Sequence, residues 1–173
     1  MAISLYDLSV ASYLQALDGV AGFLGRGLDH CRQTGADPEE LVEARLFPDM
    51  HALRFQIVQL SRHSVGALDG VKKGLFTPSR DRPQLDYAGL QTSVADARAA
   101  LQALDPAEIN ALEGGEVVFE AGDFKRLFTA EGFLLSFSLP NFYFHAATAY
   151  DILRSRGVPI GKRDFMGPLR LKG

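Results

Sequence analysis

Apolar residues recur every three or four positions along four long stretches of the sequence, and this spacing predicts amphipathic helices. The stretches cover residues 4–34, 50–73, 87–104 and 130–156. In the first stretch the apolar positions are Tyr6, Val10, Tyr13, Leu17, Val20 and Leu24. Gly35 is a suitable end for that helix, because glycine is favoured just after a helix C-terminus.

The pattern becomes strand-like between the third and fourth stretches. Valine and phenylalanine residues gather on both sides of a turn that contains Gly122, which predicts a β-hairpin over residues 116–128. A lone hairpin is marginal in water, so it must pack on the helices. We therefore predict an all-α fold, a four-helix bundle with a small β-hairpin before the last helix. No repeat or linker divides the sequence, so residues 1–173 are expected to form a single domain.

The last predicted helix is apolar on nearly every side, which is typical of a helix buried by its neighbours. Pro140 lies inside it and lacks the N–H that an α-helix uses. This proline predicts a bend or a break within one turn.

Bulk properties exclude several classes of function. The formal net charge is −3 and the basic residues are scattered, which argues against a nucleic-acid-binding face. No segment approaches the roughly 18 uninterrupted apolar residues of a membrane helix, and the N-terminus lacks the pattern of a signal peptide. Cys31 is the only cysteine, so neither an internal disulfide nor a cysteine zinc site can form. A cytoplasmic protein that does not bind membranes is expected.

A few polar residues interrupt the apolar faces of two predicted helices. Asn141, His145 and Thr148 are spaced four and three residues apart, so they share one face of the last helix. Gln56 and His63 share the inward face of the second helix. One interpretation is that these side chains hydrogen-bond to one another in the core. The other is that they line an open pocket and offer two imidazoles to a metal such as Ni or Zn.

The motif around His145 resembles that of a known family. Its residues run from Leu139 and Pro140 through Asn141 to Arg154, and the resemblance extends to residues 46–50, His63 and residues 161–165. The chain is similar over essentially its whole length to a bacterial family of unknown function in the DinB/YfiT-like superfamily.

The resemblance implies a four-helix bundle in which many members hold a divalent metal on three histidines. Carried over by position, His63 is the ligand from the second helix and His145 is one of two ligands from the last helix. The other falls on Asn141, which departs from the pattern. Two imidazoles and one amide are expected to bind a metal much more weakly than three imidazoles.

Two functions follow from these observations. The first is a small-molecule-binding or structural bundle with a degenerate metal site at His63, His145 and Asn141 and with Gln56 and Thr148 lining the pocket. The alternative is a divalent-metal-dependent enzyme of the hydrolase or thiol transferase class that uses His63 and His145. The sequence names no catalytic residue and leaves open whether the protein is an enzyme. A homodimer is expected only on general grounds.

Overall fold

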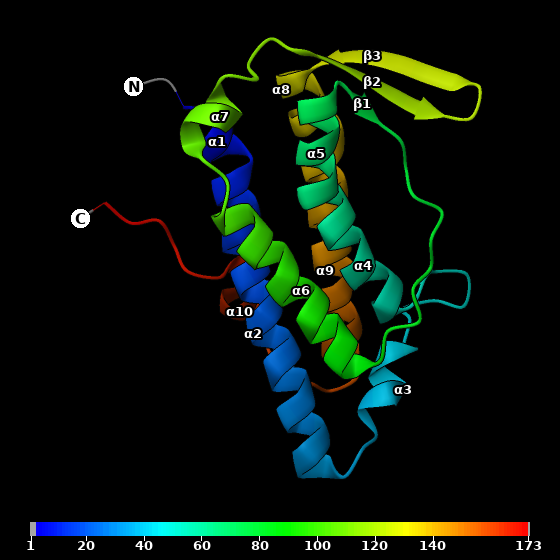
Figure 1. Cartoon of the computed structure of the whole chain (residues 1–173). Helices are drawn as coiled ribbons and strands as arrows, with labels where there is room; N and C mark the ends of the chain where they lie inside the picture. The colour runs from blue at the N-terminus through cyan, green and yellow to red at the C-terminus, as the bar shows by residue number, and fades with distance from the viewer. Residues whose placement is uncertain (1–2, 173) are drawn as a thin grey trace.

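The first predicted helix is a short helix followed by a long one. In the computed structural model, which describes residues 3–172, α1 spans Leu5–Leu8 and α2 spans Val10–Thr34 (Figure 1). They are separated at Ser9, a buried residue whose hydroxyl donates to the carbonyl of Leu5 at 2.7 Å. Serines that bond back to their own helix often bend it. α2 ends at Gly35, whose φ of 75° is left-handed and suits glycine.

The second predicted helix is divided in the same way. After the short α3 (Pro38–Val42), α4 spans Leu53–His63 and α5 spans Val65–Lys73. Buried Ser64 separates α4 from α5, and its hydroxyl donates to the Leu60 carbonyl at 2.6 Å. α4 begins three residues later than predicted, because the N–H of Leu53 donates to the Ala44 carbonyl of the preceding loop at 2.9 Å.

The third predicted helix is confirmed with nearly the expected ends, as α6 (Tyr87–Gln102). α7 (Pro106–Asn110) follows, and both helices have an aspartate N-cap that accepts a first-turn N–H. α6 packs against α2 and α4, and α4 packs against α9 (Figure 1). The apolar faces of these helices meet in one core, whose largest fully buried side chains include Tyr13, Phe23, Leu53, Leu90 and Phe142.

The predicted hairpin is confirmed, and it belongs to a sheet with one more strand than the sequence indicated. β2 spans Glu116–Ala121 and pairs antiparallel with β3, Phe124–Thr129. β1, only Leu75–Phe76, adds to β2 in parallel and pairs Phe76 with Phe119. Two residues are too few to show an alternating pattern, so the sequence could not reveal β1. The molecule is thus mostly helical with a small three-stranded sheet.

The last predicted helix changes its geometry just before Pro140. It is built from α8 (Ala130–Phe133), a π-helical turn η1 (Leu134–Ser138) and α9 (Leu139–Ser155). In η1 the N–H of Leu139 donates to the carbonyl of Leu134, five residues earlier. The wider turn interrupts the α-helical hydrogen bonds where proline cannot continue them, as the sequence predicted.

The chain closes with α10 (Lys162–Met166), which packs on α2. None of the helices within residues 3–172 has both the length and the apolar character that crossing a membrane requires.

Candidate functional site

Two buried histidines from different helices face each other. His63 is the last residue of α4 and His145 lies in the middle of α9, so 82 positions separate them along the chain. Their ring centroids are 5.7 Å apart and their planes differ by 17°. Each of the two residues is 8% exposed. The structure thus brings together the two imidazoles that the sequence singled out.

Gln56 fixes the orientation and the tautomer of His145. The side-chain oxygen of Gln56 lies 2.7 Å from Nδ1 of His145, and its amide nitrogen donates to the carbonyl of His51 at 2.9 Å. An amide oxygen only accepts hydrogen bonds, so Nδ1 of His145 carries the proton and donates it. Nε2 of His145 is therefore the unprotonated nitrogen.

His63 is held by packing and by its backbone. Its ring lies against Phe137, at a centroid distance of 5.6 Å, and against Phe76, at 6.4 Å. Within the described residues its Nδ1 is buried without a hydrogen-bond partner. Most buried polar atoms in proteins do have a partner, so this imidazole is not a fully satisfied part of a polar core.

A buried hydroxyl relay anchors the end of α4 to the π-helical turn. The hydroxyl of Ser138 donates to the carbonyl of His63 at 2.5 Å and lies 2.7 Å from the hydroxyl of Tyr13. Because Ser138 has one proton and gives it to His63, Tyr13 donates to Ser138. Burial raises the pKa of Tyr13 and keeps it protonated for this role. The relay sets the position from which the His63 side chain projects.

Both histidines are neutral near pH 7. Burial, together with the charge of nearby Arg62, lowers the pKa of His63 from 6.5 to about 4. Burial, with smaller contributions from His63 and His51, lowers the pKa of His145 to about 4 as well. A neutral imidazole offers an unprotonated nitrogen, which can accept a hydrogen bond from a ligand.

The two rings form part of the wall of a cavity of about 210 Å³, which we call the histidine pocket. Asn141 also lines it, and its amide nitrogen donates to the carbonyl of Phe137 at 2.7 Å. The remaining wall combines aromatic and polar side chains from α4, η1 and the segment after α5: Phe55, Gln59, Arg62, Phe76, Pro78, Ser79 and Phe137.

Two residues expected to line this pocket lie outside its wall. Gln56 contacts the Nδ1 side of the His145 ring, and the lining residues do not include it. Thr148 is one turn further along α9, and its hydroxyl donates to the Phe144 carbonyl of its own helix at 2.7 Å. That bond is the common local choice of a threonine in a helix, and it occupies the hydroxyl proton of Thr148.

The aromatic wall and Arg62 were not predicted from the sequence. A signal was present on α4, where Phe55, Gln59, Arg62 and His63 follow helical spacing and share a face. The contribution of Ser79 could not be read in this way, because it comes from the loop after β1.

The donor set does not match a three-histidine metal site. Across residues 3–172, no group of three or more His, Cys, Asp or Glu side chains gathers closely enough to hold a metal ion. Asn141 supplies a neutral amide in place of an imidazole, and it is bonded to its own helix. Arg62 adds a positive charge to the wall, which disfavours a divalent cation.

Comparison with known proteins identifies a family for the sequence and a solved structure with a similar fold. The family model described as Domain of unknown function (DUF1993) matches residues 5–166. A DinB family member protein from Shewanella denitrificans, solved by crystallography, superposes with a TM-score of 0.84 and 23% sequence identity, over 98% of this chain and 95% of that chain. At this identity the similarity shows a shared fold alone. No curated protein matches the sequence.

Proposed function

Because this chain belongs to the DUF1993 family of domains of unknown function and has a DinB-like fold, we propose its function from the geometry of the histidine pocket. The pocket binds a small organic molecule that has a flat apolar part and a hydroxyl or N–H donor. In this proposal residues 1–173 are a single domain, and the long helices form a four-helix bundle of the DinB type.

One observation carries the proposal. His63 is buried in the wall of a cavity, and its buried Nδ1 has no hydrogen-bond partner within the described residues. A core that kept its histidines only for structure would pair both rings, as Gln56 pairs Nδ1 of His145. An imidazole left unsatisfied in this way costs stability, which supports a role for the two rings in the pocket and not only in the core.

The wall chemistry defines the class of ligand. Phe55, Phe76 and Phe137 offer aromatic surface to a flat apolar group. Nε2 of His145 is an acceptor, because Nδ1 is the protonated nitrogen, so a ligand donor is directed there. A cavity that combines aromatic surface with directed polar groups is typical of small-molecule sites.

His63, His145 and Asn141 are, in this proposal, the remnant of a metal site that has lost one imidazole. The alternative function, a divalent-metal-dependent hydrolase or thiol transferase, draws on the closeness of the two neutral rings. It requires a ligand set that the described residues do not gather.

The test uses phenol as a probe, because it combines a flat ring with one donor. Phenol should shift the NMR signals of His145 and its neighbours, and it should bind about five-fold more tightly than anisole, which lacks the donor. His145→Phe should abolish the difference between the two probes. His30→Gln, which changes a histidine outside the pocket, should preserve it.

Two results would overturn the proposal. One is equal binding of phenol and anisole by the unaltered protein, which would show that no acceptor faces the pocket. The other is stoichiometric Zn²⁺ or Ni²⁺ in untagged protein that is lost in both His63→Phe and His145→Phe. That result would favour the metal-dependent alternative.

A further inference from the structure

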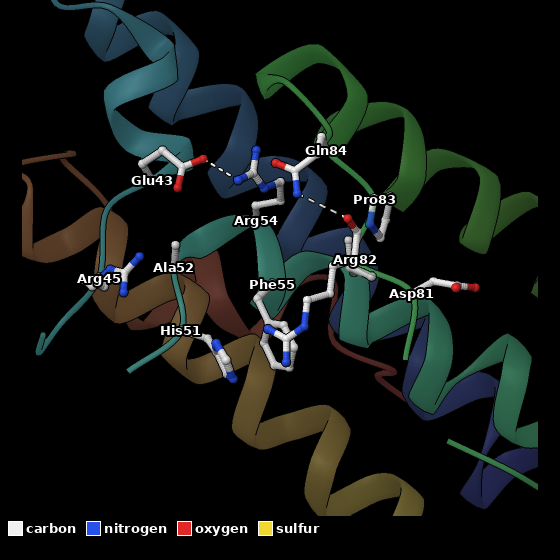
Figure 2. Close-up of a pocket in the computed structure, with 11 residues that line it drawn as sticks. Glu43, Arg45, His51, Ala52, Arg54, Phe55, Asp81, Arg82, Pro83 and Gln84 are labelled. Carbon is white, nitrogen blue, oxygen red and sulfur yellow. Dashed lines mark hydrogen bonds and ion pairs between the residues drawn. The ribbon is translucent and has the colours of Figure 1, made fainter. Parts of the chain in front are cut away.

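A second cavity lies beside the histidine pocket, and arginines surround it (Figure 2). It measures about 170 Å³ and is bounded by the loop before α4, the first turn of α4 and the loop before α6. Phe55 lines both cavities. Three arginines, Arg45, Arg54 and Arg82, line only the second one, which we call the arginine cavity.

Two of the three positive charges have no carboxylate partner. Arg54 forms an ion pair with Glu43 at 2.5 Å. Arg45 donates to the carbonyl of Pro48 at 3.4 Å, and the guanidinium of Arg82 lies over the ring of Phe55 at 5.4 Å from its centroid. Within residues 3–172 neither Arg45 nor Arg82 takes part in an ion pair.

The other acidic residue of the wall does not neutralise these charges. The carboxylate of Asp81 accepts a hydrogen bond from the hydroxyl of Ser79 at 3.1 Å, on the loop that also carries Arg82. In Figure 2 it extends away from Phe55 and from the guanidinium of Arg82. The three arginines outnumber Glu43 and Asp81 in the lining, so the arginine cavity keeps a net positive charge.

The start of α4 adds to this positive potential. Ala52 is its N-cap and has no side-chain oxygen, so no side chain caps the first turn of the helix. Ala52, Arg54 and Phe55 line the cavity, which places the N-terminal end of the helix at its wall. The partial positive charge of that end favours an anion, in the same direction as the arginines.

From these observations we propose that the arginine cavity binds a phosphate dianion, either free or as the phosphate group of a small ester. Two unpaired guanidinium groups match its two negative charges, and planar guanidinium forks suit phosphate oxygens. A carboxylate would balance only one of the charges, and a cation would be repelled. The inference stands apart from the proposed function, because these arginines do not line the histidine pocket.

The experiment is an NMR titration with inorganic phosphate at about 0.15 M salt and above pH 7, where the dianion dominates. Saturable shifts should appear at the backbone amides of residues 52–55. Arg45→Ala and Arg82→Ala should each raise the dissociation constant at least about ten-fold, because each removes a charge-assisted contact. Phenyl phosphate, titrated in parallel, identifies an ester as the ligand if it binds more tightly than phosphate.

Arg80→Ala is the matched control. Arg80 lies two residues from Arg82 in the same exposed loop, and it lines neither cavity. Its loss should change the dissociation constant less than about two-fold, because distant surface charges are screened. The proposal is overturned if binding does not saturate, if acetate binds as tightly as phosphate, or if Arg80→Ala weakens binding as much as Arg82→Ala. Circular dichroism of each variant checks that it is folded.

Discussion

Acid should destabilise this protein through the two histidines of the pocket. Burial lowers the pKa of His63 and of His145 from 6.5 to about 4 in the folded chain. In the unfolded chain both return to about 6.5. Below that pH the unfolded state binds protons that the folded state does not bind, so the free energy of unfolding falls as the pH falls. This contribution stops growing below about pH 4, where the folded state also becomes protonated.

The magnitude follows from the two pKa values. At pH 5 the unfolded histidine is almost fully protonated and the folded one is mostly neutral, which costs about 2 kcal/mol for each residue. The two together remove about 4 kcal/mol between pH 7 and pH 5. Domains of ordinary stability have about 5–15 kcal/mol in total, so the effect is large enough to measure.

Urea unfolding at a series of pH values tests this reasoning. His63→Phe replaces the ring by an apolar one that suits its neighbours Phe76 and Phe137, and it should remove about half of the acid sensitivity. His30→Gln should leave that sensitivity in place. Parallel stability curves for the unaltered protein and His63→Phe between pH 7 and pH 5 would refute the argument.

Two further predictions concern packing around the site. Ser138→Ala should lower the free energy of unfolding by about 1–3 kcal/mol, because it leaves the hydroxyl of Tyr13 and the carbonyl of His63 unpaired. A loss below about 0.5 kcal/mol in urea unfolding would contradict the relay. Gly19→Ala should cost about 1–3 kcal/mol, because an added Cβ would lie 2.5 Å from a backbone oxygen of α10. The control Gly22→Ala, whose added Cβ would meet nothing within 4 Å, should be neutral or stabilising when both glycine variants are compared by urea unfolding.

Helical spacing was a good guide to the helices and a poor guide to their interruptions. It located α6 nearly to the residue, since apolar positions record which face is buried. It could not show the breaks at Ser9 and Ser64, because each depends on a hydroxyl that bonds to its own helix. Pro140 was the exception, because its missing N–H is a property of the residue itself.

The candidate site was predictable where it lies on regular helices. His63 and His145 each lie on the buried face of their own helix, which helical spacing predicted. The family resemblance predicted that the two rings lie close together, and their centroids are near each other in the structure. The contributions of Ser79 and Arg82 to the two cavities were not visible, because they depend on the path of the loop that follows β1. The hydrogen bond of Thr148 to its own helix was not visible either, because helical spacing gives the face of a side chain and not the partner of its hydroxyl.

The three long-range hydrogen bonds that hold the site together also determine when the site can form during folding. Tyr13 meets Ser138 across 125 positions, Gln56 meets His145 across 89, and Ser138 meets the backbone of His63 across 75. Such separations raise the contact order of a mostly helical chain, and high contact order slows folding. We expect the helices to form early and these three bonds to form only when the last helix docks. A truncated or nascent chain that lacks α9 would therefore have helices without a histidine pocket.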